Sequence, residues 1–385
     1  MNDENLIHGS VAAGFEAVKS TFAEVVAAEN GQLSAQLAAY HHGKLVVDLW
    51  SGPETTADAL FDTYSASKGA GALVVALLLQ DGLLSLDEKV SYYWPEFAAK
   101  GKENITLRQL MSHQAGLPGA DYGFTADELT DDRRVAEQLA RQRPYWNPGS
   151  AFGYHALVFG ALLNEVVCRV TGRTVQQHFS ERVQQAYDVD FFLGMPEALD
   201  SRYQPTLAGD LTPEKLAELL ANAPAADSIA GIAFNRHHPD NPPLWALVNS
   251  LKARRSGTIS FGGVASARGL AKMYAVAASQ VENKPPLLTA ETLSQVTQIQ
   301  SRGEDLVLKN FKAFSVGFHA SAEYYPSLGQ GAFGHSGAGG QQAFADPRHG
   351  LSYGYTRRQY PSPFRTVSEN DQLISALSRS AAVLR

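Results

Sequence analysis

Residues 65–79 read Ser65-Ala66-Ser67-Lys68-Gly69-Ala70-Gly71-Ala72-Leu73-Val74-Val75-Ala76-Leu77-Leu78-Leu79, the most apolar helical run in the chain. Its second half has almost no polar side chain, which predicts a central helix that is buried on all sides. We expect Asp62 or Thr63 to cap the beginning of this helix and Gly82 to mark its end. The first turn of such a buried helix is rigid, so the polar residues in that turn are held in fixed positions.

Ser65 and Lys68 are those polar residues. Three positions apart on a helix, they lie on one face and are close enough to share a proton. A serine hydroxyl is a weak nucleophile until a base takes its proton, and a desolvated lysine amine can be that base. The amide N–H of Ser65, unpaired at a helix start, can face a developing oxyanion. The pattern favours an acyl-transferring serine hydrolase, and the alternative is a capping serine beside a solvated lysine.

Strand signals gather at the two ends of the chain. Residues 36–40 and 45–50 flank a Gly-containing turn and predict a β-hairpin after a helix at residues 15–26. Further strands are expected at residues 314–320, 341–346 and 351–356, followed by a last helix that ends near Leu384. The predicted fold class is α/β (α+β), with one antiparallel sheet built from both chain termini and flanked by helices.

Helical patterns dominate the middle of the chain, most clearly at residues 107–111, 135–139, 157–170 and 270–278. We therefore expect an α/β domain formed by residues 1–83 and 287–385, and an inserted, mainly helical domain formed by residues 84–286. Residues 205–243 lack a sustained period, and we interpret them as a long excursion that covers the site as a lid. The active site is expected in the crevice between the two parts.

The composition is that of a well-packed soluble enzyme. The chain has 385 residues, of which 44% are hydrophobic and 18% charged, and its net charge of −7 argues against a nucleic-acid or anionic-membrane surface. The first residues are acidic and polar, unlike a secretory signal, and no apolar stretch is as long as a membrane span. The single cysteine, Cys168, lies in an apolar stretch and is interpreted as an inert thiol. These features predict a cytoplasmic protein.

Two later segments contain further candidate site residues. Tyr154 follows a Pro-Gly turn just before a helix, where its phenol could relay protons in the same crevice, although a packed aromatic is the alternative. The second segment reads Gly334-His335-Ser336-Gly337-Ala338-Gly339-Gly340 and precedes a strand. Clustered glycines allow a ligand to approach the backbone closely, and a flexible connection is the alternative.

Together these segments resemble the serine β-lactamase and penicillin-binding-protein superfamily, whose first motif is Ser-x-x-Lys. The resemblance is greatest to class C β-lactamase-like carboxylesterases, also called family VIII esterases. Tyr154-His155-Ala156 matches the second motif and His335-Ser336-Gly337 the third. Intervening stretches at residues 87–90, 94–97, 105–117 and 262–271 are also similar, and the order of all of them is that of the family.

The resemblance implies roles for these residues. Ser65 is the expected nucleophile, Lys68 the residue that activates it, and Tyr154 the proton shuttle. The backbone N–H groups of Ser65 and Ala338 would hold the oxyanion. The acyl side of the substrate would be lined by His335, Ser336 and Gly337.

Two departures from the family pattern favour a neutral small-molecule ester over a charged amide as the substrate. His335 replaces a permanently charged lysine, so the attraction for a substrate carboxylate is weakened. Ala156 replaces an asparagine that can hydrogen-bond an amide side chain. The leading interpretation is a serine carboxylesterase that forms an acyl-enzyme on Ser65. The alternatives are a β-lactamase, D-amino-acid peptidase, amide hydrolase or acyltransferase on the same scaffold, or a non-catalytic binding protein.

No cofactor or metal is expected. The pairs His41-His42 and His237-His238 are not accompanied by a metal-ligand spacing, and His113 is interpreted as a structural residue. No Gly-x-Ser-x-Gly, phosphate-binding loop or dinucleotide fingerprint occurs. Oligomeric state is left open.

Overall fold

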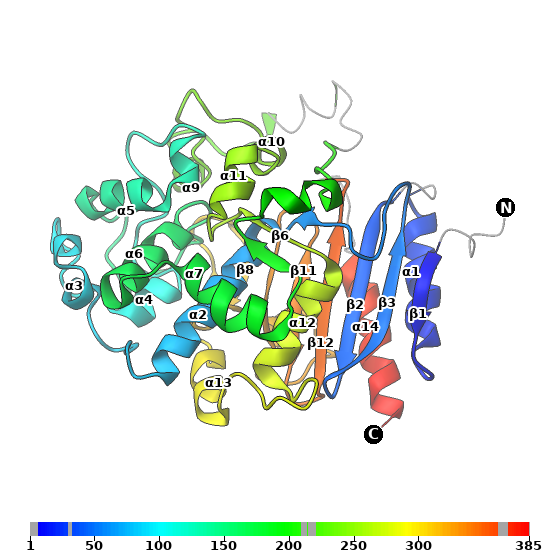
Figure 1. Ribbon diagram of the computed structural model, residues 1–385. Helices are drawn as coiled ribbons and strands as arrows, with labels where there is room; N and C mark the ends of the chain where they lie inside the picture. The colour runs from blue at the N-terminus through cyan, green and yellow to red at the C-terminus, as the bar shows by residue number, and fades with distance from the viewer. Residues whose placement is uncertain (1–6, 30–32, 209–213, 215–220, 361–368, 385) are drawn as a thin grey trace.

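A nine-stranded antiparallel sheet is built from both ends of the chain (Figure 1). The computed structural model describes residues 7–29, 33–208, 214, 221–360 and 369–384. The strands, in their order across the sheet, are β1 (Ile7–Val11), β3 (Lys44–Ser51), β2 (Ala35–His41), β12 (Leu351–Arg357), β11 (Gln342–Asp346), β10 (Phe333–Ser336), β9 (His319–Ala320), β8 (Phe311–Phe314) and β7 (Ser301–Glu304). The predicted sheet of N-terminal and C-terminal strands is confirmed.

A small second sheet includes the strand that comes directly before the Ser65 turn in the sequence. Its strands are β4 (Phe61–Asp62), β6 (Gly263–Ala265) and β5 (Phe191–Leu193). The α-helices are α1 (Glu16–Ala27), α2 (Ser67–Gln80), α3 (Val90–Tyr93), α4 (Leu107–Met111), α5 (Asp132–Arg141), α6 (Phe159–Thr171), α7 (Val175–Phe179), α9 (Ile229–Ala233), α10 (Leu244–Val248), α11 (Leu251–Ser256), α12 (Ala267–Ala278), α13 (Ala290–Thr297) and α14 (Glu369–Val383). Short 3₁₀ or π segments are η2 (Tyr64–Ala66), η3 (Pro95–Ala98), η4 (Glu128–Thr130), η5 (Ser180–Gln185), η6 (Glu197–Arg202) and η7 (Ser321–Glu323).

Both faces of the large sheet are covered. Helices α1 and α14 pack together on one face, where Leu37 and Ala39 of β2 join their core. On the other face, Ala38 and Tyr40 of the same strand join the core of α2 and α12. Alternate residues of β2 therefore enter two different cores, because side chains alternate across a strand. Figure 1 shows α1 and α14 on one side of the sheet and the remaining helices on the other.

Helix α2 is the central helix that its apolar run predicts. Residues 67–78 are all buried, including Lys68. Two glycines allow this packing, since a Cβ on Gly69 would lie 2.1 Å from the Tyr274 hydroxyl and one on Gly71 would lie 2.4 Å from Ile259. Burial on all sides thus depends on small residues where neighbours approach the helix.

Some local predictions were wrong. Residues 314–320, expected as one strand, form the end of β8, a turn and β9, and Phe314 pairs with His319. Strand β10 was not predicted, because its sequence Phe-Gly-His-Ser lacks the β-branched residues typical of strands. Thr63 does not cap the helix, and its hydroxyl instead lies 2.8 Å from Ser67 Oγ and 2.9 Å from the Gly263 carbonyl.

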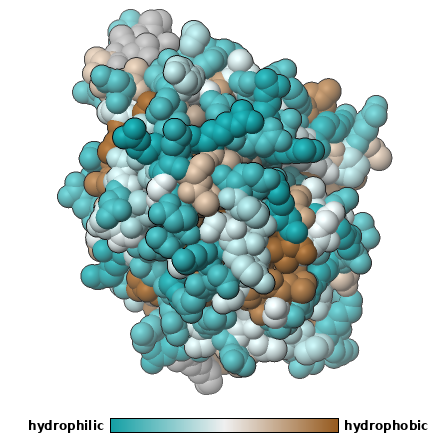
Figure 2. Space-filling model, turned by 90° about the vertical axis from the view of Figure 1, so that its left-hand side faces the viewer, coloured by the Kyte–Doolittle hydropathy of each residue, from teal (hydrophilic) through white to brown (hydrophobic). Residues whose placement is uncertain are grey.

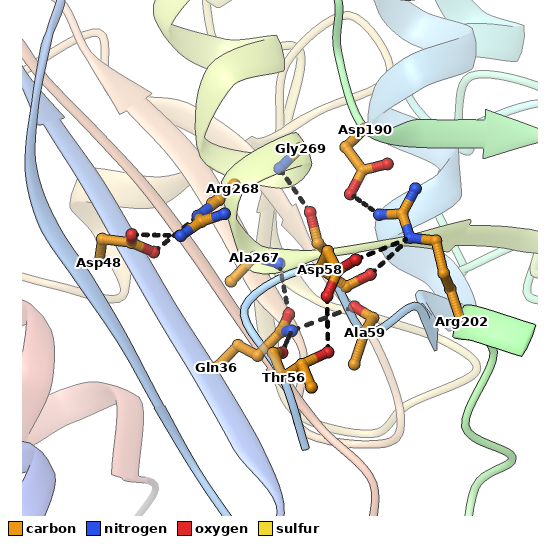
Figure 3. A network of polar contacts seen from close by, with 11 residues as sticks. Gln36, Asp48, Thr56, Asp58, Ala59, Asp190, Arg202, Ala267, Arg268 and Gly269 are labelled. Atoms are coloured by element: carbon orange, nitrogen blue, oxygen red, sulfur yellow. Dashed lines mark hydrogen bonds and ion pairs between the residues drawn. The ribbon is translucent and has the colours of Figure 1, made fainter. Parts of the chain in front are cut away.

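A network of polar contacts attaches the sheet to α12 and to the segment before β4 (Figure 3). Gln36 of β2 accepts a hydrogen bond from the Ala267 amide at 2.9 Å and donates to the carbonyls of Thr56 and Ala59. Arg268 forms a two-pronged ion pair with Asp48 of β3. Helix α12 therefore packs on the large sheet, although it belongs to residues 84–286, the segment expected to form the inserted helical domain.

The excursion at residues 205–243 falls partly outside the described residues, at positions 209–213 and 215–220. The described remainder includes α9, and Phe234 just after that helix lines the pocket considered below. In the described part of the chain, no helix combines the length and apolar character that crossing a membrane requires.

Candidate active site

Ser65 lies in the tight turn η2, directly before α2. Tyr64, immediately before it, has a φ of 49°, a left-handed conformation that is uncommon for a non-glycine residue. Ser67 holds this turn in place: its hydroxyl donates to the Tyr64 carbonyl at 2.6 Å and accepts from the Gly263 amide at 2.9 Å. The candidate nucleophile is therefore on a backbone fixed from both sides, and it is half-buried.

Lys68 meets three oxygen atoms. Its Nζ lies 3.0 Å from Ser65 Oγ, 2.7 Å from the Ala156 carbonyl and 2.7 Å from the Ser260 carbonyl. A charged amine would donate to all three. A neutral amine has two N–H groups for the two carbonyls, which leaves its lone pair for the Ser65 hydroxyl proton. The contact set thus suits a lysine that exchanges one proton with Ser65.

Burial lowers the pKa of Lys68 well below its usual value of 10.5. The side chain is 0% exposed, and no carboxylate of the described residues forms an ion pair with it. Removing an ammonium from water disfavours its charged form unless an anion compensates. The surroundings therefore favour the neutral amine, the form that can act as a base.

Tyr154 is positioned by a carboxylate that the sequence did not point to. Asp305 Oδ1 accepts hydrogen bonds from the backbone N–H groups of Tyr154 at 3.1 Å, Val307 at 2.8 Å and Leu308 at 2.8 Å. The Leu306 amide also donates to the Phe152 carbonyl at 3.1 Å. Asp305 thereby joins the loop after β7 to the segment that carries Tyr154.

The Tyr154 ring lies beside the serine–lysine pair. Its centroid is 5.0 Å from Lys68 Nζ, and its phenol interacts with Ser65. Burial raises the pKa of Tyr154 far above 10, and the hydrogen bond with Ser65 opposes that shift only in part. A protonated phenol at this place can donate a proton, whereas Lys68 is the group suited to accept one.

The segment after β10 lines the same cavity as Ser65. In the turn at residues 337–340, the Gly337 amide donates to the Gln341 carbonyl at 2.7 Å and the Gly340 amide to the Gly337 carbonyl at 3.0 Å. A Cβ on Gly337 would lie 2.5 Å from the Thr63 carbonyl. These glycines therefore allow close approach of the turn to the Ser65 segment. Among the described residues, the N–H of exposed Ala338 has no acceptor, so it is free to bind an oxyanion.

His335 is buried rather than exposed in the pocket. His335 is 1% exposed; its ring is tilted by 30° against that of His319, with centroids 4.1 Å apart, and its Nδ1 lies 2.8 Å from the Ser336 carbonyl. Burial lowers the pKa of His335 to about 3. Its Nε2 has no partner among the described residues. The ring is neutral, and Ser336, not His335, contributes to the pocket wall.

The neighbouring histidines are structural. The Nδ1 of His155 lies 2.7 Å from the Gly153 carbonyl while its Nε2 accepts from the Leu117 amide at 3.1 Å, which fixes a neutral tautomer. Burial lowers the pKa of His155 to about 4. His113 Nδ1 accepts from the His155 amide at 3.2 Å, in agreement with the structural role expected for His113.

A cavity of about 170 Å³ opens at Ser65. Its other lining residues are Tyr64, Tyr154, Ala156, Leu157, Phe234, Leu244, Phe261, Leu308, Lys312, His319, Ser336, Gly337 and Ala338. The wall is largely apolar and aromatic. Of the residues predicted for the site, Ser65, Tyr154, Ser336, Gly337 and Ala338 line this cavity, and Lys68 lies directly behind Ser65.

Two more voluminous grooves contain none of the predicted site residues. One of about 910 Å³ follows α5 and is lined mainly by charged residues, and one of about 850 Å³ is lined mainly by residues of α13 and of the segment 320–332. The face that carries α3 and α5 is mostly hydrophilic, with hydrophobic residues in small separate patches (Figure 2). Among the described residues, no group of three or more His, Cys, Asp or Glu is arranged to hold a metal ion.

Sequence reasoning missed Ser67, Asp305 and Ser260 as contributors to this site. Ser67 lies inside the quoted motif and could have been recognised as a second polar residue of the first turn. Asp305 and Ser260 are far from the motifs in sequence, and Ser260 acts on Lys68 through its backbone carbonyl. No side-chain pattern could have indicated that contact.

Comparison with known proteins adds an independent observation. A family model described as Beta-lactamase matches residues 18–377. The protein named "Esterase/beta-lactamase LipL" from Mycobacterium tuberculosis (strain ATCC 25618 / H37Rv) is 30% identical over 346 residues, which are 85% of this chain and 77% of the relative.

Two solved structures are similar over nearly their whole length. EstA from Arthrobacter nitroguajacolicus Rue61a has 38% sequence identity and a TM-score of 0.89, with 97% of this chain and 98% of that one covered. A family VIII carboxylesterase has 31% identity and a TM-score of 0.85, with 97% and 99% covered. The fold is therefore shared with both structures along 97% of this chain.

Proposed function

Because the chain belongs to the beta-lactamase family, within the superfamily of serine β-lactamases and penicillin-binding proteins, we propose that it is a serine carboxylesterase acting on small to medium esters. The observation that carries the proposal is the contact set of Lys68. Its amine is buried without a counter-ion, is satisfied by two carbonyls and lies 3.0 Å from Ser65 Oγ. This arrangement supports a base that takes the serine proton.

The proposed reaction has two halves. In the first, the Ser65 hydroxyl gives its proton to Lys68 while its oxygen attacks the ester carbonyl carbon, and the N–H groups of Ser65 and Ala338 hold the oxyanion. The C–O bond then breaks, the leaving alkoxide receives a proton through Tyr154, and an acyl-enzyme remains. In the second half, water gives a proton to the same relay and attacks the acyl carbon. The bond between the acyl carbon and Ser65 Oγ then breaks, Oγ takes the proton back from the relay, and the acid is released.

Several features favour an ester over a β-lactam. The third-motif histidine is neutral and buried, so it supplies no positive charge to hold a substrate carboxylate. The second-motif position Ala156 offers only its carbonyl, and that carbonyl already accepts from Lys68. A cavity of about 170 Å³ fits a short acyl group. A second candidate, β-lactam hydrolysis, is supported by the double name of the relative LipL.

Matched substrates separate the two candidates. We expect kcat/KM of the purified protein for para-nitrophenyl butyrate to exceed that for a chromogenic cephalosporin and for a D-amino-acid anilide by at least about a hundredfold. Ser65→Ala should abolish ester hydrolysis, while Ser20→Ala, at an exposed serine of α1 outside the cavity, is the control that should keep the wild-type rate. A dominant rate on the β-lactam would replace the esterase assignment.

A further inference from the structure

Lys312 is a charged residue of the pocket that the proposed reaction does not use. It lies on β8 and lines the cavity together with Ser65, Tyr154 and His319. Burial lowers the pKa of His319 well below its usual value, so that ring is neutral. Among the described lining residues, Lys312 therefore carries the one formal charge, and the rest of the wall is apolar or uncharged.

The ammonium of Lys312 has no counter-ion in the described part of the chain. Its Nζ lies over the ring of Tyr324, 5.4 Å from the centroid, and no carboxylate is within ion-pair distance. Glu323, the neighbour of Tyr324, pairs with Arg302 at 2.8 Å. Asp305 attracts Lys312 from beyond ion-pair distance; its Oδ1 is occupied by three backbone amides, and its buried Oδ2 has no hydrogen-bond partner in the described part of the chain.

Such a cation is costly unless an anion joins it. The side chain is half-buried, and burial lowers the pKa of Lys312, with Asp305 opposing the shift. An attraction between opposite charges is stronger beside apolar walls such as Leu308 and Leu157 than in water. A ligand carboxylate in the cavity would offset the cost of this unpaired charge.

We propose that Lys312 is a specificity-determining residue that binds a carboxylate on the substrate, so that the enzyme prefers esters that carry an anionic group, such as half-esters of dicarboxylic acids. This inference rests on the proposed esterase function, because it names the substrate class of the same pocket. The proposal revises the expectation that the substrate is a neutral ester. That expectation was based on the missing positive charge at His335 and did not take Lys312 into account. The cation comes from β8, two strands away from the strand that carries His335.

Two pairs of probes test the proposal and show which half of the ester carries the anion. For the acid half, the mono-para-nitrophenyl ester of adipic acid is compared with its neutral terminal amide. For the alcohol half, para-acetoxybenzoate is compared with para-acetoxybenzamide. The variants are Lys312→Met, which removes the charge, Lys312→Arg, which keeps it, and Lys44→Met as a control at an exposed lysine outside the pocket.

In at least one pair, we expect the wild-type kcat/KM to favour the anionic ester and Lys312→Met to reduce that preference about tenfold or more. The rate on the neutral probe should change less than about threefold, Lys312→Arg should retain most of the preference, and added salt should weaken it. A merely structural lysine would lower both rates of a pair together. An unchanged anionic-to-neutral ratio in Lys312→Met overturns the proposal, whereas a wild-type protein inactive on all four probes overturns the esterase function itself.

Discussion

The proton of Lys68 decides what the serine–lysine pair can do. With three oxygen neighbours and no carboxylate partner among the described residues, the amine is satisfied in its charged and its neutral form. Only the neutral form can take the Ser65 proton. Since burial lowers the pKa of Lys68, the neutral form is present at a lower pH than for a solvated lysine. Tyr154, whose pKa is raised, keeps its proton over the same range.

The pH profile follows from these two shifts. As pH rises through the lowered pKa of Lys68, the base becomes available, so kcat/KM for a neutral aryl ester should rise with a slope of one and reach its plateau well below pH 10.5. Lys68→Arg, which stays charged, and Lys68→Met should each lower kcat/KM about a thousandfold. Stopped assays between pH 5 and 9 measure both effects. A Lys68→Arg variant with the wild-type rate and profile would show that another group is the base.

At the scale of elements, the site is the meeting of the Ser65 turn, the Tyr154 segment and the turn after β10. The turn after β10 has no room for a side chain at Gly337, since a Cβ there would lie 2.5 Å from the Thr63 carbonyl and 2.7 Å from Gln341 Oε1. Gly337 does not have a positive φ angle, so glycine is required at this position because a side chain would not fit and not because of the backbone conformation. Its neighbour Ala338 supplies the proposed second N–H of the oxyanion hole.

Gly337→Ala tests this contact. The added methyl should push the turn away from Ser65 and move the Ala338 N–H, so we expect kcat to fall about a hundredfold, the scale of losing one oxyanion donor. The substrate KM should change much less. Ala338→Gly, which removes only an exposed methyl and keeps the N–H, is the matched control and should remain active. If Gly337→Ala keeps the wild-type kcat, the turn does not form the oxyanion hole.

Elements with a strong period were predictable, and those that depend on distant partners were not. The apolar run of α2 and the two short runs around the Gly-containing turn between β2 and β3 each reflect a local match between sequence and structure. By contrast, β10 is a strand because β9 and β11 pair with it, against the weak preference of Gly334 and His335. The site residues Ser65, Lys68 and Tyr154 were found through motifs. The carbonyl of Ser260 and the carboxylate of Asp305 required the fold to bring them there.

At the scale of the whole molecule, two buried carboxylates link stability to pH. Asp132 accepts hydrogen bonds from Thr258 at 2.6 Å and Asn164 at 3.2 Å, and Asp62 accepts from Tyr203 and Thr206. Burial raises the pKa of each carboxyl from 3.8 to about 6, although these hydrogen bonds lower it. Because the folded-state pKa is the higher one, the stability from proton binding is fully present below about pH 4 and lost as pH rises through 6.

Asp132→Asn isolates one of these carboxyls. The amide cannot titrate, so between pH 5 and 7.5 the wild-type free energy of unfolding should fall by about 1 kcal/mol relative to the variant. Urea unfolding at the two pH values measures this difference. Any packing cost of the asparagine is the same at both pH values, so it cancels when the two free energies of unfolding are subtracted. Asp127→Asn, at an exposed ion pair with Lys252, is the control that should leave the pH dependence unchanged. Parallel pH curves for wild type and Asp132→Asn would contradict the raised pKa.

The central claim is that Ser65 is the residue that forms the covalent intermediate. The most direct measurement is intact-mass and peptide mass spectrometry after reaction with an aryl fluorophosphonate, with residual ester hydrolysis followed in the same samples. We expect one adduct per chain, located on Ser65, with activity lost in proportion and no adduct in Ser65→Ala. Full labelling at another residue, or full ester hydrolysis by a protein whose Ser65 is completely modified, would contradict the account.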